Sequence, residues 1–176
     1  MIKKSEKSGQ FYLISVIILS SVIISVALIP NYLDKKKNVD FYDFKDEISV
    51  ESKKTMEYGL NNSFTSQQMN SLMQNFTREY IKKRLSGMSL YFMFGNLNNF
   101  TLRGFQEKND SVFINSGSSI LVTQTPGNFS GSVDPSSSVF NLTVNGNSFY
   151  FNISSAENFH FVIKQNYSEE EYLEKG

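Results

Sequence analysis

Few residues of this 176-residue chain are of the types that perform catalytic or metal chemistry. The sequence has no cysteine, which excludes disulfides, thiolate metal ligands and a cysteine nucleophile. His160 is the single histidine, so a His-rich metal centre is excluded as well. Asp110 and Asp134 follow turn-like sequences and could hold a cation or serve a glycosidase, but isolated loop acids are more often solvated turn residues.

No phosphate-binding loop, nucleophile elbow or dinucleotide fingerprint is present in the sequence. We therefore expect no catalytic activity, no cofactor and no metal. The one recurrent chemical motif is Asn-x-Ser/Thr, the acceptor for N-glycosylation, which occurs more often than the composition alone predicts. The candidate acceptors are Asn61, Asn75, Asn99, Asn109, Asn128, Asn141, Asn152 and Asn166. Glycosylation and an unmodified Asn- and Ser-rich composition both remain open.

An uncharged apolar run from Phe11 to Ile29 is the strongest pattern in the sequence. At 1.5 Å per residue, nineteen helical residues span roughly 28 Å, close to the hydrocarbon thickness of a bilayer. The run has no polar stripe at helical spacing, and its serines can donate hydrogen bonds to backbone carbonyls. Residues 11–30 are therefore predicted to form a transmembrane helix.

Three fates of this segment remain open. It can stay as a permanent anchor, which its length favours, or act as a secretory signal cleaved after Ala27. In the third, the chain is cleaved between Gly9 and Gln10, at the end of a short Lys-rich leader segment, residues 1–10.

The stretch KKSEKSGQFYLISVIIL resembles the class III (prepilin-like) leader of archaeal pilins and pilin-like surface proteins. The resemblance covers about thirty residues. It implies that Gly9 and Gln10 flank the bond cut by a leader peptidase, and that the helix anchors the protein and packs with other pilin-like subunits. The glutamate usual five residues into such mature pilins is Ile14 here, so the resemblance supports membrane attachment more than filament assembly.

Charge is unevenly distributed along the chain. Residues 1–37 carry net +4 and residues 38–176 carry net −4, while the whole chain is neutral. Neutrality argues against a general nucleic-acid-binding surface, so no nucleic-acid partner is expected. Lysines flank both ends of the apolar run, which leaves the positive-inside rule nearly tied. The long, acidic, Asn-rich downstream chain favours a cytoplasmic N-terminus and an extracytoplasmic C-terminal domain.

Two amphipathic helices are predicted after the apolar run, within a membrane-proximal region at residues 31–88. The first spans Asp40–Tyr58, with Asp40 as N-cap and Gly59 in the left-handed cap position. The second begins at a Thr65–Gln68 capping box and ends with basic residues at 82–84. Its apolar face comprises Met69, Leu72, Met73, Phe76 and Tyr80. We interpret the basic residues as compensation of the helix dipole and the methionines as core.

The hydrophobic period changes to two from Leu90 onward, which predicts short antiparallel strands over residues 89–168. Asn145-Gly146 favours a type I′ turn that pairs Leu142 with Phe149 and Phe140 with Phe151. In a last strand at 159–164, Phe159, Phe161 and Ile163 are predicted to face inward, which leaves His160, Val162 and Lys164 on the other face. The acidic residues 169–176 are expected to fray.

The sequence thus predicts an α+β protein with an N-terminal transmembrane helix, one or two amphipathic helices and a C-terminal antiparallel β-sheet or sandwich. We expect a single-pass, membrane-anchored surface protein, structural and pilin-like, with the lipid bilayer as partner. The alternative is an external module that binds glycans or a partner protein, with Tyr91 or Tyr150 as an aromatic platform.

Overall fold

The computed structural model describes residues 6–115, 119–123, 125–133, 138–167 and 170–176. Within these ranges the side chains of 6–11, 25–39, 119–123, 167 and 170 are not described. The chain divides into two units, Met1–Asp43 and Phe44–Gly176. The architecture is α+β with antiparallel sheets, as the sequence predicts.

The first unit is helical. Helix α1, Glu6–Asn61, runs through it without a break and continues into the second unit, so Pro30 does not end the helix. Gly9, Gln10 and the whole apolar run therefore belong to α1, but the side chains of the two candidate leader residues lie outside the described part. Among the residues that the structure describes, no helix combines the length and apolar composition that a membrane crossing needs. The predicted transmembrane helix at 11–30 is not confirmed.

The predicted caps of the Asp40–Tyr58 helix are wrong. Asp40 lies inside α1 and cannot be its N-cap, because the helical hydrogen bonding continues through this position. The helix also passes Gly59 and ends at Asn61, where Ser63 adopts the left-handed conformation with φ of 55°. The amide of Phe64 donates to the Gly59 carbonyl (3.0 Å) and that of Ser63 to the Leu60 carbonyl (3.0 Å), which is a Schellman motif.

Gly59 serves close packing instead of chain reversal. A Cβ placed on Gly59 would lie 2.6 Å from Cε of Met69, so the absent side chain lets α1 approach the next helix. The ring of Phe64 packs edge-on against Tyr58 at 5.8 Å between centroids, which supplies the hydrophobic contact that accompanies such caps.

Helix α2, Ser66–Lys83, forms as predicted. Thr65 caps it, with the Thr65 hydroxyl accepting from the Gln68 amide and the Gln68 side chain accepting from the Thr65 amide. Its buried face comprises Met69, Met73, Thr77, Tyr80 and Ile81, with the predicted Leu72 and Phe76 at its half-buried margin. Lys82 and Lys83 fall in the last turn.

We expect Thr65→Ala to lower the free energy of unfolding by about 1 kcal/mol, because an N-terminal amide of α2 loses its acceptor. Chemical denaturation of the full chain measures the change. Ser71→Ala is the matched control: its hydroxyl donates only to the Gln67 carbonyl within the helix, so its loss should cost nothing measurable. Equal losses in the two variants would contradict the capping role.

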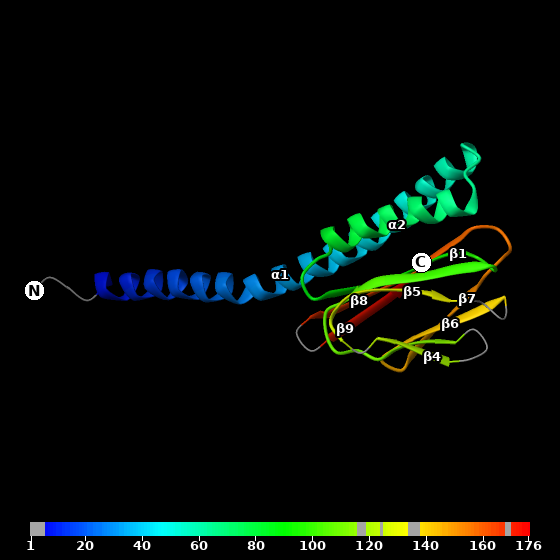
Figure 1. Ribbon diagram of the computed structural model, residues 1–176. Coiled ribbons are helices and arrows are strands. Elements are labelled where there is room, and N and C mark those ends of the chain that lie inside the picture. The colour runs from blue at the N-terminus through cyan, green and yellow to red at the C-terminus, as the bar shows by residue number, and fades with distance from the viewer. Residues whose placement is uncertain (1–5, 116–118, 124, 134–137, 168–169) are drawn as a thin grey trace, which may run out of the picture. The chain divides into compact units, whose positions relative to one another are not determined.

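The strands of the second unit form two antiparallel sheets. They are β1 Met88–Asn96, β2 Asn99–Gln106, β3 Val112–Asn115, β4 Ser119–Thr123, β5 Gly127–Val133, β6 Val139–Val144, β7 Asn147–Asn152, β8 Asn158–Tyr167 and β9 Glu170–Lys175. The five-stranded sheet has the order β5-β2-β1-β8-β9 and the four-stranded sheet the order β4-β3-β6-β7. Figure 1 shows α2 over the five-stranded sheet, and the four-stranded sheet lies on that sheet's opposite face.

The core between the two sheets contains side chains of both. Its fully buried members include Tyr91, Met93, Phe100, Leu102, Val112, Ile114, Phe140, Leu142, Val144 and Val162. Because α2 covers the other face of β1, every residue of that strand is buried. The structure is therefore a β-sandwich with helices added as a third layer.

The predicted hairpin at Asn145-Gly146 is confirmed. Asn145 and Gly146 have φ of 50° and 82°, and Leu142 pairs with Phe149 and Phe140 with Phe151. A type I′ turn needs left-handed backbone at both central residues, which Asn and Gly adopt most readily.

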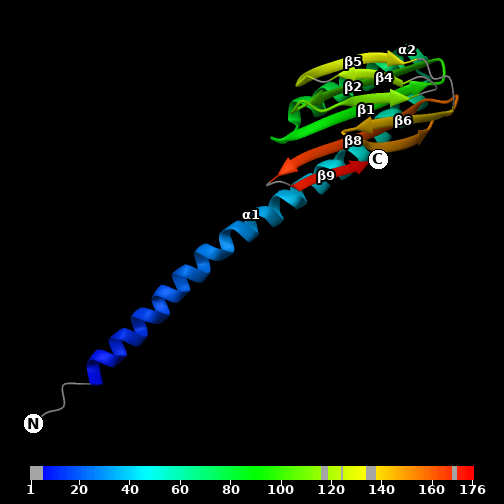
Figure 2. The same ribbon diagram turned by 90° about the horizontal axis from the view of Figure 1, so that it is seen from below.

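The C-terminal end of the chain differs from expectation. Residues 170–175 do not fray but form β9, which pairs with β8 along the edge of the five-stranded sheet (Figure 2). The strand is stable because its backbone forms hydrogen bonds with β8, and because the side chain of Leu173 packs against the core. The acidic composition of residues 170–175 did not predict this pairing.

Candidate functional site

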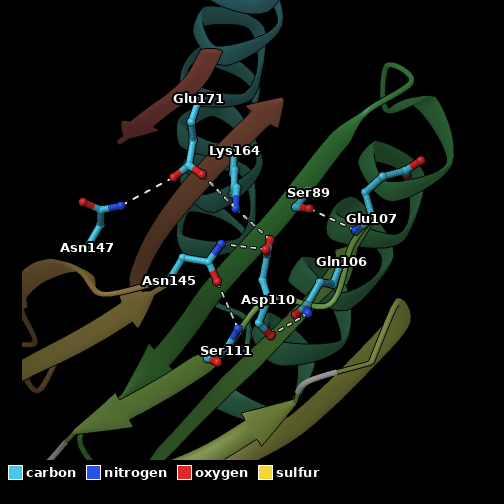
Figure 3. A network of polar contacts seen from close by, with 9 residues as sticks. All are labelled: Ser89, Gln106, Glu107, Asp110, Ser111, Asn145, Asn147, Lys164 and Glu171. Carbon is cyan, nitrogen blue, oxygen red and sulfur yellow. Dashed lines mark hydrogen bonds and ion pairs between the residues drawn. The ribbon is translucent and has the colours of Figure 1, made fainter. Parts of the chain in front are cut away.

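A buried polar cluster lies at one end of the interior of the sandwich, and we call it the Lys164 cluster. Its central residues are Lys164 on β8, Asp110 in the loop between β2 and β3, and Glu171 on β9 (Figure 3). On β8, Lys164 lies on the same face as the core residue Val162, two residues before it. On β9, Glu171 lies on the same face as Leu173, which packs against the core. Strand alternation therefore aims these polar groups into the space that the core occupies elsewhere.

The ammonium group of Lys164 is held between two carboxylates. Nζ lies 2.9 Å from Oδ2 of Asp110 and 3.1 Å from Oε2 of Glu171. The Lys164 and Asp110 side chains are only 2% and 6% exposed, whereas that of Glu171 is 35% exposed. The pair is thus desolvated on the Asp110 side and reaches solvent through Glu171.

The carboxylate of Asp110 is fixed from several elements. Asn145, in the hairpin turn, donates from Nδ2 to Oδ1 of Asp110 (2.7 Å), and its own Oδ1 accepts from the Ser111 amide (3.1 Å). Gln106 donates from Nε2 to the Asp110 carbonyl (2.7 Å). These contacts tie the loop to both sheets, because Gln106 ends β2 and Asn145 follows β6.

Two polar atoms beside the cluster, the Tyr91 hydroxyl and Oε1 of Gln106, are buried without a hydrogen-bond partner of good geometry among the described residues. Burial raises the pKa of the Tyr91 hydroxyl, the charge of Asp110 adds to this rise, and the nearby Ser89 side chain opposes it. Tyr91 is therefore a neutral phenol at physiological pH. Unpaired buried polar atoms are uncommon in folded proteins, so this end of the sandwich is a candidate functional site.

The structure places these residues differently from the sequence prediction. The sequence indicates a solvated turn acid at Asp110, but this residue is 4% exposed, because the loop folds inward beneath the hairpin turn. Strand alternation predicts Lys164 on the face away from the core, but both faces of β8 are covered. Tyr91, the candidate surface platform, is fully buried. Asp134 lies outside the described residues.

The eight candidate glycosylation sites are not brought together. Asn61, Asn75, Asn99, Asn109, Asn128 and Asn152 are exposed, whereas Asn141 and Asn166 are half-buried. The Oδ1 atom of Asn141 is buried and has no hydrogen-bond partner among the described residues. Six of the eight side chains are therefore open to a modifying enzyme in this structure, and occupancy stays a prediction.

His160 lines a surface pocket of about 470 Å³ between the C-terminal part of α1 and β8. Its ring packs on Phe151 at 4.9 Å between centroids, and Nε2 lies 3.3 Å from the Asn152 carbonyl oxygen. Within the described residues it makes no hydrogen bond to a carboxylate, so no acid–base pair is assembled there. The sequence places His160 on the face of its strand opposite Phe161, and on that face Phe151 covers the ring.

We expect His160 to make stability depend on pH. Burial lowers the pKa of His160, with the charge of Lys175 adding to the effect, so the folded state binds the proton more weakly than the unfolded chain. Stability should be full above the unfolded pKa of about 6.5 and fall as pH decreases below it. Denaturation of wild type and His160→Gln between about pH 5 and pH 7.5 measures this difference. Identical pH profiles would contradict the assignment.

A second pocket, of about 300 Å³, is basic and is lined by Arg78, Lys82 and Arg103 together with Asn128 and Ser130. Lys82 is paired with Glu79 at 2.8 Å. Burial and the neighbouring Arg78 lower the pKa of Arg103, which still remains charged. No group of three or more metal-ligating side chains is found in the described ranges.

Comparisons with protein-family models, curated proteins and solved structures find no match for this chain.

Proposed function

We propose that this protein is a membrane-anchored, extracytoplasmic structural protein of the cell surface, a pilin-like subunit without catalytic activity. One observation carries the proposal. From Tyr12 to Ile24, every described side chain of α1 is exposed, and ten of them are large and apolar, each at least 55% exposed. Leaving such side chains in water forfeits about 1.5–3 kcal/mol each relative to burial, so an apolar environment must cover them.

The polar groups of this segment suit a lipid environment. The Ser20 hydroxyl donates to the Val16 carbonyl (2.6 Å) and the Ser21 hydroxyl to the Ile17 carbonyl (2.7 Å). Each hydroxyl is thereby satisfied inside the helix, as a bilayer requires. The sequence supports an anchor of nineteen uncharged residues, Phe11–Ile29, with the N-terminus cytoplasmic.

Membrane fractionation of the full chain tests the anchor. Wild type should stay in the membrane pellet after alkaline carbonate extraction and require detergent for release. Ile18→Arg combined with Ile23→Arg should move the protein to the supernatant, because each charge costs about 2.5–3.5 kcal/mol near the bilayer centre. Val50→Arg, which changes an exposed apolar residue of the same helix beyond the run, is the matched control. Wild type in the supernatant would refute the anchor.

N-terminal sequencing of the membrane-bound product distinguishes the three fates of the leader. A terminus at Gln10 supports processing by a pilin-type leader peptidase, and one at Met1 supports a permanent unprocessed anchor. A terminus at Leu28 indicates a secretory signal and contradicts stable anchoring by this helix.

A second candidate function is binding of external glycans. It is favoured by two exposed aromatic side chains on the outer face of the four-stranded sheet, Tyr150 (62%) and Phe113 (38%). Aromatic faces of this kind can stack on sugar rings. Binding on a glycan array that is lost in Tyr150→Ala and kept in Tyr58→Ala, an exposed tyrosine on α1, would support this function. An array without signal would leave the structural function as the better proposal.

A further inference from the structure

The Lys164 cluster places an amine against a carboxylate in an arrangement that an ion pair alone does not need. Oδ2 of Asp110 and Oε2 of Glu171 both lie within 3.1 Å of Nζ of Lys164, and the three residues belong to separate segments of the fold. The Asp110 carboxylate also receives the Asn145 Nδ2 hydrogen on its other oxygen. The carboxylate that carries the acyl carbon and a second carboxylate are therefore both held against the same amine.

The reaction requires the uncharged forms of the amine and the carboxylic acid. Holding an ammonium and a carboxylate away from water is costly, and moving the proton from Nζ to the carboxylate removes both charges. The products are a neutral amine, which is nucleophilic, and a neutral carboxylic acid, which can lose water. Fixing the two groups in contact supplies the large effective concentration that such a reaction needs.

We propose that Lys164 and Asp110 become joined by an autocatalytic isopeptide bond, with Glu171 as the group that transfers the proton. Nζ attacks Cγ of Asp110, the new bond is N–C, and the bond that breaks is Cγ–Oδ2. Glu171 accepts a proton from Nζ and delivers it to Oδ2, which leaves as water. One amine and one carboxylic acid become one amide and one water, without an oxidant or co-reactant.

The remaining contacts fit this reaction. Asn145 donates to Oδ1, the oxygen on which negative charge develops in the tetrahedral intermediate. Glu171 is the exposed member of the trio, so the released water has a path to solvent on its side. Lys164 and Asp110 are almost inaccessible, which protects the amide from hydrolysis.

The bond would join the two sheets covalently. Asp110 precedes β3 of the four-stranded sheet, Lys164 belongs to β8 of the five-stranded sheet, and 54 positions separate them in the sequence. Closing so long a loop restricts the unfolded chain, as a disulfide does. A chain without cysteine would thereby gain a cross-link that does not depend on redox conditions.

Tryptic digestion gives a direct test. After Lys108 the next cleavage point is Lys164, and the next after that is Lys175, so the unlinked chain releases 109–164 and 165–175 as separate peptides. Acylation of Lys164 blocks cleavage at that residue. The linked chain should therefore release 109–175 as one peptide, lighter than its sequence by the mass of one water molecule.

The experiment uses the full chain, folded in detergent and made in a host without N-glycosylation, and digested after denaturation. Fragmentation of the linked peptide should place the bond between Lys164 and Asp110. Lys164→Arg keeps the charge and should abolish the water loss, and Glu171→Gln should reduce it severalfold. Lys45→Arg, which alters the partly exposed Lys45–Glu174 pair at 3.0 Å, should leave the bond intact.

Folded wild type that releases 109–164 and 165–175 at full mass would overturn the proposal. A bond from Lys164 to Glu171 instead of Asp110 would overturn it as well, and undiminished water loss in Glu171→Gln would overturn the role of Glu171. None of these outcomes depends on membrane attachment, so the inference and the proposed function can fail separately.

Discussion

Asp110→Ala is expected to be about 3 kcal/mol less stable than the double variant Asp110→Ala/Lys164→Met, because the single change leaves a buried ammonium with an incomplete set of partners. Lys164 is 2% exposed, so water cannot replace the lost carboxylate. We take the lower end of the usual 3–5 kcal/mol range, since Glu171 still lies near Nζ. Urea denaturation of both variants measures the difference.

The comparison between these two variants isolates the charge. Neither variant can form the proposed bond, because both lack Asp110. The bond therefore does not affect the difference in stability between them. Glu174→Ala is the matched control, because its pair with Lys45 is 24% and 35% exposed and such pairs contribute about 1 kcal/mol or less. A double variant no more stable than Asp110→Ala would show that the buried charge is not the source of the loss.

Phe100→Ala is expected to lower the free energy of unfolding by about 3–5 kcal/mol, through lost burial and the cavity left behind. Phe100 on β2 is fully buried, and its ring meets Phe140 on β6 edge-on at 5.2 Å between centroids. This contact spans the two sheets, so the change removes packing from both. Denaturant unfolding at fixed pH gives the loss.

Phe113→Ala is the control for that prediction. It removes the same side chain from the outer face of the four-stranded sheet, where 38% of Phe113 is exposed, and should cost much less. Losses of similar size in the two variants would indicate that the two sheets do not depend on this contact for their packing.

Protein surfaces normally carry scattered apolar side chains, but α1 carries ten large ones in thirteen consecutive residues. Among the described residues of the sandwich, in contrast, most large apolar side chains are buried, and few, such as Tyr150 and Phe113, are exposed. A covalent cross-link between the sheets would suit a surface protein, because unfolding in an extracellular medium is followed by proteolysis. The proposed function and the proposed bond are compatible but rest on different residues.

Local sequence signals predicted several elements correctly. The Asn145-Gly146 hairpin has the expected register, because backbone conformation at the turn and side-chain alternation both act within a few residues. The Thr65–Gln68 capping box formed for the same reason. The α+β class and the antiparallel strands also follow from local periodicity.

The sequence did not predict the pairing of β9 or the continuity of α1. Residues 170–175 look like a solvated acidic tail until β8 supplies backbone partners, and that pairing depends on the arrangement of the whole sheet. Pro30 lies inside α1, and Gly59 packs closely against Met69 while Ser63 takes the left-handed position after the helix. Such signals are weak compared with tertiary contacts.

The apolar N-terminal run, the hairpin register, the helix cap and the absence of cysteine chemistry follow from the sequence alone, since each depends on composition or on residues close in the chain. Which side chains are buried between the sheets depends instead on how distant segments pack together. Lys164 and Asp110 look like ordinary polar residues along the chain, and they meet because helices cover one face of the five-stranded sheet and the second sheet covers the other.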